Sequence, residues 1–198
     1  MTPIETAVIV ALPEAEEAVG RLRAELDRSA AWGVPAHLTV LYPFLPPGAV
    51  DQRVLAALAA AVATVPAFEV ALVRCGWFGE VLWLAPEPAQ PFRRLTTAVH
   101  RRFPDHPPYR GAHPALVPHL TVGHDAPVQA LRAAAAEIAA RLPILARVRS
   151  ARLIQGSTAA GSWHTVTELP LGSAARSTDQ RSGPAGPRAT PGSAAPGC

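Results

Sequence analysis

The sequence contains the same four residues twice, and this repeat constrains the fold more than any other feature. His-Leu-Thr-Val runs from His37 to Val40 and again from His119 to Val122, each time shortly after a Val-Pro pair. Each copy alternates polar and apolar side chains, as half-buried strands do. Because side chains two apart on a strand share a face, the His and Thr of each copy point one way and the Leu and Val point into a core.

Two interpretations of this repeat are open. In the first, two unrelated strands each present a His and a Thr to solvent. In the second, the fold brings the two strands together and makes one site from both polar faces. The elements around the copies favour the second interpretation, because strands and helices alternate in a similar order in both halves of the chain.

The periodicity and the Pro and Gly breaks predict the elements of both halves. Helices are expected from Pro13 to before Gly33 and over 50–65, 91–103 and 128–142; strands are expected over 4–12, 37–44, 68–72, 81–84, 144–154 and 163–171. We therefore predict an α+β fold, a duplicated two-lobed module. Each lobe is an antiparallel sheet with helices on its outer face, and the active-site cleft lies between the lobes.

The domain is expected to span residues 1–172. From residue 173 to residue 198 the composition changes to Ser, Gly, Pro, Ala and Arg, with no aliphatic side chain larger than Ala. Such a segment cannot bury enough apolar surface to order itself, so residues 173–198 are predicted to be a disordered tail.

The charged residues exclude several functions. The sequence has no lysine, since all 18 basic residues are Arg. This rules out a P-loop lysine and a covalent lysyl intermediate, including a ligase that carries AMP on lysine. The formal net charge is only +3, and much of it falls in the tail. A nearly neutral body argues against broad binding to duplex nucleic acid.

The two cysteines, Cys75 and Cys198, are read as thiols in a reducing compartment, because one lies in an apolar run and the other ends the chain. No cysteine cluster suggests zinc. The start of the sequence lacks the basic-then-apolar pattern of a signal peptide, and no apolar run is long enough to span a membrane. These features predict a cytoplasmic protein without membrane association.

The residue types of the repeat suit acid–base chemistry at a phosphate. An imidazole titrates near neutral pH, so one His can accept a proton from an attacking oxygen while another donates one to a leaving oxygen. Thr hydroxyls can donate hydrogen bonds to non-bridging phosphate oxygens, where charge gathers in the transition state. The four side chains together describe metal-free attack on a phosphodiester, and a strained cyclic phosphate is an attractive substrate.

Over about residues 4–172 the sequence resembles the 2H phosphoesterase superfamily, which includes bacterial 2′-5′ RNA ligases and RNA 2′,3′-cyclic phosphodiesterases. The paired motifs, the Leu-Tyr-Pro-Phe continuation and the Pro-rich loop before the second motif carry this resemblance. The resemblance implies that His37 is the proton donor, that His119 is the acceptor, and that Thr39 and Thr121 hold the phosphate. It also implies that neither metal nor cofactor is needed.

The implied reaction opens a 2′,3′-cyclic phosphate, on an RNA end or on a nucleotide, to a 2′-phosphate; the reverse direction would form a 2′-5′ bond between RNA ends. One alternative is a non-catalytic module that binds RNA ends or nucleotides in the same cleft. Another is a His-based metallophosphoesterase, for which few carboxylates lie near the motif histidines in the sequence. The protein is expected to be a monomer.

Three further residues are predicted to bind substrate. Tyr42 follows the first motif and can stack on a base, although a strand aromatic of this kind can equally be packing. Tyr109 and Arg110 lie in the loop before the second motif, where Arg can hold a flanking phosphate; a solvated loop is the alternative. His124 is assigned a capping or supporting role rather than a metal site, and the indole side chains of Trp83 and Trp163 are assigned to the core.

Overall fold

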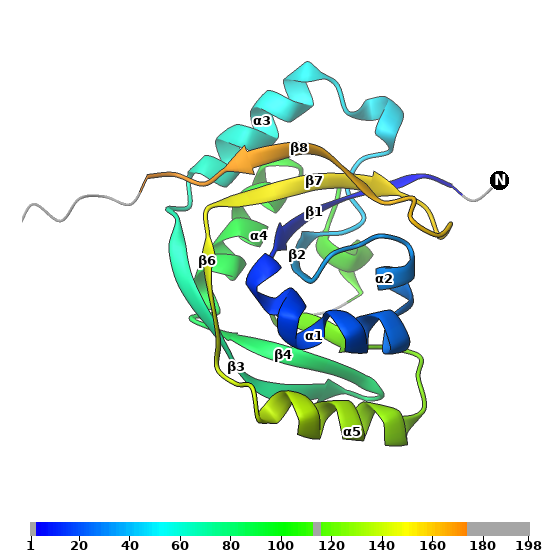
Figure 1. The fold of residues 1–198 in the computed structure, drawn as a ribbon. Coiled ribbons are helices and arrows are strands. Elements are labelled where there is room, and N and C mark those ends of the chain that lie inside the picture. Colours follow the sequence, from blue (N-terminus) through cyan, green and yellow to red (C-terminus); the bar gives the residue numbers. More distant parts are fainter. Residues whose placement is uncertain (1–2, 113–115, 174–198) are drawn as a thin grey trace, which may run out of the picture.

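The computed structural model describes residues 3–112 and 116–173. All of the predicted tail except its first residue, and with it Cys198, lies outside these residues. The described chain forms one curled antiparallel sheet in the strand order β6-β3-β4-β5-β2-β1-β7-β8 (Figure 1). The strands are β1 (Glu5–Ala11), β2 (His37–Leu41), β3 (Phe68–Phe78), β4 (Val81–Glu87), β5 (Leu120–Gly123), β6 (Ile144–Val148), β7 (Ser150–Gly156) and β8 (His164–Pro170).

The sheet consists of two matched halves that meet between β2 and β5. Read outward from this junction, one half is β2-β1-β7-β8 and the other is β5-β4-β3-β6. The junction is short, with Leu38 opposite Leu120 in an antiparallel pair. The predicted α+β fold of two duplicated lobes is confirmed, with the sheets of the lobes joined edge to edge.

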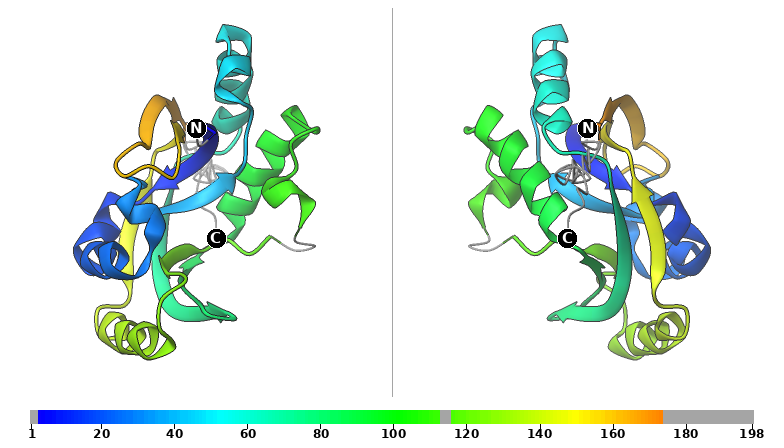
Figure 2. Two further views of the ribbon diagram at one scale, coloured as in Figure 1. Left: turned by 90° about the vertical axis from the view of Figure 1, so that its right-hand side faces the viewer. Right: turned by 90° about the vertical axis from the view of Figure 1, so that its left-hand side faces the viewer.

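The helices cover the two halves in pairs. They are α1 (Pro13–Leu26), α2 (Arg28–Ala31), α3 (Gln52–Ala63), α4 (Gln90–Arg102) and α5 (Val128–Ala139), with 3-10 turns η1 (Pro47–Ala49) and η2 (Pro108–Gly111). Helices α3 and α4 pack together, against β8 and β2 respectively, whereas α1 packs on β5 and β6 and α5 on β3 (Figures 1 and 2). The buried faces of both pairs belong to one continuous hydrophobic core.

The first helix begins and ends where its residues favour it. Pro13 occupies the first turn, with Glu14 and Glu16 beside it at the positive end of the helix. After α1 ends at Leu26, the side chain of Asp27 caps the short helix α2. After α2 the chain turns back and enters β2, a central strand of the sheet that carries the first motif.

Several element boundaries differ from the prediction. Strands β3 and β4 extend past residues 72 and 84 to Phe78 and Glu87, and the helix expected from Pro13 to before Gly33 is divided at Asp27 into α1 and α2. The segment 144–154, expected as one strand, is two strands in opposite halves of the sheet, because β6 pairs with β3 and β7 pairs with β1. The chain crosses between the halves at Arg149. Because apolar residues recur on both sides of Arg149, the sequence pattern does not show where one strand ends and the next begins. The first motif strand ends at Leu41 rather than Phe44, since Tyr42 and Pro43 already turn away. None of the described helices is long and apolar enough to cross a membrane.

Candidate active site

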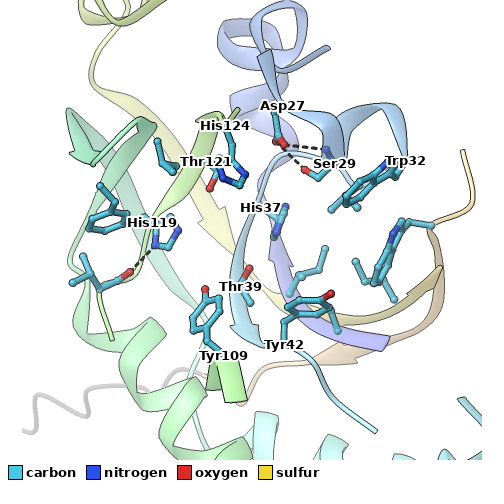
Figure 3. A pocket seen from close by; sticks show the side chains of 18 of the residues that line it. Asp27, Ser29, Trp32, His37, Thr39, Tyr42, Tyr109, His119, Thr121 and His124 are labelled. Atoms are coloured by element: carbon cyan, nitrogen blue, oxygen red, sulfur yellow. Dashed lines mark hydrogen bonds between the residues drawn. The ribbon is translucent and has the colours of Figure 1, made fainter. Parts of the chain in front are cut away.

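The structure brings the two motifs together on one side of the sheet. Leu38 and Leu120 are buried in the core and lie opposite each other across the junction of β2 and β5. His37, Thr39, His119 and Thr121 therefore face the other side, where all four line one cleft of about 650 Å³ (Figure 3). Antiparallel register around the Leu38–Leu120 pair sets each His near the Thr of the other copy.

Both imidazoles are anchored in the same way. His37 Nδ1 lies 2.8 Å from the carbonyl oxygen of Pro35, and His119 Nδ1 lies 2.7 Å from that of Val117. A carbonyl oxygen only accepts, so each Nδ1 carries the hydrogen and donates it. In the neutral ring Nε2 is then the accepting nitrogen. The repeated Val-Pro lead therefore orients both histidines so that Nε2 is the atom that can gain or lose a proton.

The surroundings of His37 favour its neutral form. The pKa of His37 is lowered to about 4, chiefly by desolvation and then by the positive charge of Arg23, while the hydrogen bond to Pro35 and the charge of Asp27 act in the opposite direction. The charge of His119 also lowers this pKa. Before an anionic substrate binds, His37 is therefore a neutral imidazole at pH 7.

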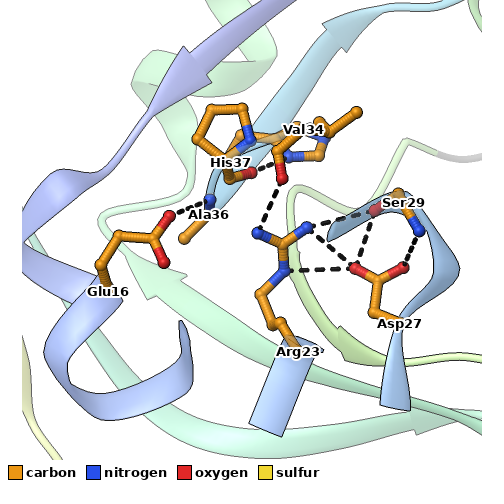
Figure 4. A network of polar contacts seen from close by, with 8 residues as sticks. Glu16, Arg23, Asp27, Ser29, Val34, Ala36 and His37 are labelled. Atoms are coloured by element: carbon orange, nitrogen blue, oxygen red, sulfur yellow. Dashed lines mark hydrogen bonds and ion pairs between the residues drawn. The ribbon is translucent and has the colours of Figure 1, made fainter. Parts of the chain in front are cut away.

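A buried ion pair lies directly behind His37 (Figure 4). Arg23 and Asp27 are only 2% and 7% exposed. Arg23 Nη2 donates to Asp27 Oδ2 at 2.9 Å, and its Nη1 donates to the Val34 carbonyl at 3.1 Å. Asp27 also accepts from the backbone and hydroxyl of Ser29. Nearby, Glu16 Oε1 accepts from the Ala36 amide at 2.6 Å, so the segment that enters β2 is held at two points.

Sequence reasoning missed this network. The spacing of Arg23 and Asp27, four residues apart on either side of a helix end, was a signal for an ion pair. Such pairs are usually solvated, whereas this one is buried. Nothing in the local pattern distinguishes the two cases.

The surroundings of His119 are aromatic. Its ring meets Phe78 edge-on at 5.1 Å and Trp83 at 6.0 Å between centroids. Phe78 and Trp83 stack on each other at 4.7 Å, and the guanidinium of Arg74 lies 5.7 Å from the Trp83 ring. Trp83 is buried, as predicted. The β3–β4 hairpin thus supports the second motif by ring packing.

Tyr42, Tyr109 and Arg110, the three further residues predicted to bind substrate, differ in how they lie relative to the cleft. Tyr42 and Tyr109 line the cleft, and the Tyr109 amide donates to the Tyr42 carbonyl at 2.7 Å. The Tyr109 side chain hydrogen-bonds Thr39, and burial raises the pKa of the Tyr109 phenol. The Tyr42 hydroxyl donates to Glu5. Burial of the phenol, together with this hydrogen bond and the negative charge of Glu5, raises the pKa of Tyr42 to about 12. Arg110 is 77% exposed, pairs with Glu5 at 3.4 Å and does not line the cleft.

Other cleft residues correct or extend the prediction. Trp163, assigned to the core, is half-buried and lines the cleft, as does Trp32, which sequence reasoning missed. His124 lines the opposite end, where its amide donates to the Leu26 carbonyl and its Nε2 lies 3.3 Å from Asp125. Within residues 3–112 and 116–173, no group of three or more His, Cys, Asp or Glu side chains is placed to hold a metal ion.

These features agree with the comparison with known families. The family model described as the 2′-5′ RNA ligase superfamily matches residues 11–159. The chain belongs to this superfamily, that of the 2H phosphoesterases, as its paired motifs predicted. The search of curated proteins gave no match.

Solved structures of the same fold are similar over nearly their whole length. E. coli LigT complexed with NADP+ superposes with a TM-score of 0.54 at 19% identity, covering 87% of this chain and 99% of LigT. E. coli LigT complexed with 3′-AMP gives 0.55 at 18% identity, covering 85% and 98%. TT0787 of Thermus thermophilus gives 0.56 at 18% identity, covering 85% and 98%. At these identities the likeness supports the two-lobed fold.

Proposed function

We propose that this protein is a metal-independent phosphodiesterase that opens 2′,3′-cyclic phosphates to 2′-phosphates, with His37 and His119 as the acid–base pair. One observation carries the proposal: two identically anchored imidazoles and two Thr hydroxyls line one cleft from adjacent strands. Membership of the 2′-5′ RNA ligase superfamily makes a phosphoester the natural substrate.

The proposed step is an in-line displacement at phosphorus. Water attacks the phosphorus atom, and its proton passes to one imidazole Nε2. The bond from phosphorus to the 3′ oxygen breaks, and the other imidazole donates its proton to that oxygen. Thr39 and Thr121 donate hydrogen bonds to the non-bridging oxygens. When a 5′-hydroxyl replaces water, the same arrangement forms a 2′-5′ bond.

The assignment of donor and acceptor follows from how charge changes on binding. The family resemblance gives His37 the role of donor, yet its pKa of about 4 keeps it neutral before substrate binds. A bound phosphate is an anion beside the ring, which favours the imidazolium and raises the pKa. We therefore propose that substrate binding brings a proton onto His37.

Turnover in the presence of EDTA tests this function. Purified protein is incubated with 2′,3′-cyclic AMP or with a cyclic-phosphate-ended RNA, and the product is identified as the 2′- or 3′-phosphate. We expect the 2′-phosphate, formed equally well with EDTA and abolished when both His37 and His119 are replaced by Ala. Loss of activity in EDTA would indicate a metal enzyme, and binding without turnover would indicate a non-catalytic module. A monomeric state and a cytoplasmic location stay predictions.

A further inference from the structure

The segment that leads into the first motif has a partner for every polar group of its backbone. This segment, which we call the first lead, consists of Val34, Pro35 and Ala36. The Val34 amide donates to the Ser29 carbonyl at 3.0 Å, and the Leu12 amide donates to the Ala36 carbonyl at 2.9 Å. Pro35 has no N–H, and its carbonyl accepts from His37 Nδ1 at 2.8 Å. The remaining two groups, the Val34 carbonyl and the Ala36 amide, are bonded by side chains of α1.

Two side chains of opposite charge hold the first lead from α1 (Figure 4). Arg23 Nη1 donates to the Val34 carbonyl at 3.1 Å, and Glu16 Oε1 accepts from the Ala36 amide at 2.6 Å. The spacing of Arg23 and Glu16 corresponds to about two helical turns, so both lie on one face of the helix. Each charge meets the backbone group that suits it, and charge-assisted hydrogen bonds of this kind are stronger than neutral ones. Helix α1 therefore holds the backbone on both sides of Pro35.

Arg23 is itself held by several contacts. Its Nε and Nη2 both donate to Asp27 Oδ2, at 3.2 and 2.9 Å, and Nη2 also donates to the Ser29 hydroxyl at 3.1 Å. A guanidinium is a rigid planar fork, so these bonds determine the direction in which Nη1 points toward the first lead. The pair of Arg21 and Glu25 has the same spacing on α1, but its side chains are 60% and 56% exposed, and an exposed pair contributes little. Arg21 therefore provides a matched control for Arg23.

We propose that Arg23 is a positioning residue for the reaction, because it holds the backbone that carries the hydrogen-bond acceptor of His37. The peptide group that Arg23 contacts precedes Pro35, and the carbonyl that accepts from His37 Nδ1 follows it. The ring of Pro35 fixes one of the two torsions between these peptide groups, so a constraint on the first limits the orientation of the second. Arg23 is not among the described residues that line the cleft, so its role is separate from contact with substrate. Its effect on turnover rests on the proposed function, whereas its effect on the ring of His37 does not.

The tautomer of His37 tests this role without turnover. Heteronuclear NMR of the ring nitrogens at pH 7 should show only the Nδ1–H form of neutral His37 in the original protein, with His37→Gln used to assign its signals. In Arg23→Met/Asp27→Asn both buried charges are removed together, so neither is left unpaired, and Asn still offers an oxygen to the Ser29 amide. We expect both tautomers of His37 in this double variant. The signals of His119 should stay unchanged, because its own acceptor lies before the second motif.

Two further variants complete the NMR test. Arg23→Lys keeps a positive charge for Asp27 but lacks the fork that reaches Asp27 and Val34 at once, so it should also release the ring of His37. This variant serves if the double variant does not fold. Arg21→Met breaks an exposed pair on the same helix and should alter neither imidazole. Unchanged His37 signals in the folded variants of Arg23 would overturn the proposal.

Turnover of 2′,3′-cyclic AMP provides the second arm. The double variant should lower kcat about 10- to 100-fold, because a reacting group misplaced by about 1 Å can cost about 10²-fold, and should leave KM within about threefold. Arg21→Met should keep both constants. A changed His37 tautomer beside an unchanged kcat would also overturn the proposal. If the original protein turns over no cyclic phosphate, the proposed function fails, and the NMR comparison still decides whether Arg23 fixes the ring.

Discussion

The two halves of the cleft present the same four residues on different supports. In the first half, His37 lies in front of a buried ion pair, and Arg23 reaches the backbone just before it. In the second half, His119 rests against the edges of two stacked aromatic rings. Both imidazoles keep the same Nδ1 anchor. The anchor that fixes the geometry is thus duplicated, whereas the surroundings that set the protonation state are not.

This difference is what an acid–base pair requires. Two identical histidines in identical surroundings would compete for the same proton. Surroundings that separate their proton affinities allow one ring to hold a proton while the other accepts one. The Arg23 guanidinium behind His37 disfavours the imidazolium of His37 in the free protein, so the donor role proposed for His37 depends on the phosphate that binds beside it.

Replacing each histidine in turn tests whether the halves contribute equally to turnover. We expect His37→Ala and His119→Ala each to lower kcat for 2′,3′-cyclic AMP by about 10²- to 10⁴-fold, the usual contribution of a positioned acid or base. His164→Ala, at an exposed position on β8, is the matched control and should keep normal turnover. Full activity in either motif variant would show that one half is dispensable.

Removing a carboxylate tests the unequal supports. Asp27→Ala leaves the Arg23 charge buried and unpaired, which should lower the free energy of unfolding by about 3–5 kcal/mol. Asp125→Ala breaks a surface pair with Arg28, whose side chains are 46% and 70% exposed, and should cost less than about 1 kcal/mol. Urea denaturation measures both. Similar losses would mean that the ion pair behind His37 has no special role in stability.

Acid stability reports the half-buried imidazole of His37. In the unfolded chain His37 binds a proton near the ordinary histidine pKa of 6.5, whereas in the folded chain it does so only near 4. The unfolded state therefore gains protons first, and stability should fall by about 3 kcal/mol as the pH drops from 6.5 to 4. His37→Gln should remove most of this loss. A variant with the same pH dependence of unfolding as the original protein would argue against a depressed pKa.

Arg110 is expected to have the smallest effect. Its pair with Glu5 is exposed, so Arg110→Ala should change the free energy of unfolding by no more than about 1 kcal/mol. The dissociation constant of a mononucleotide should stay within twofold. A selective loss of affinity for cyclic-phosphate-ended RNA would instead support the sequence-based prediction that Arg110 holds a flanking phosphate.

The parts of the molecule that the sequence predicts are those governed by local pattern. Alternation places His37 and Thr39 on one face, and the repeat at His119 predicts the duplicated fold. The Pro13 start of α1 and the hairpin of β3 and β4 follow from equally local rules.

The missed features depend on contacts between distant segments. Arg23 and Asp27 are buried and bonded to residues that follow α1, the Val34 carbonyl and Ser29. Trp163 lines the cleft, and its amide donates to the Trp32 carbonyl. From the sequence, a Trp at the start of an amphipathic strand is assigned to the core, because the pattern does not show whether its side chain points to the core or to the cleft. The split of 144–154 into β6 and β7 is likewise set by pairing partners in opposite halves of the sheet.

The central claim, that His37 and His119 are an acid–base pair with separated proton affinities, is tested most directly by the pH dependence of turnover. With 2′,3′-cyclic AMP as substrate, we expect a bell-shaped dependence of kcat/KM on pH, which reports the free enzyme. Its acidic limb should lie near the His37 pKa of about 4, because both rings are protonated below that pH. In kcat the limb should move to higher pH, because the bound phosphate favours the imidazolium; activity regained on return to pH 7 excludes irreversible denaturation. A profile without an acidic limb, or a limb at the same pH in kcat and kcat/KM, would contradict the account.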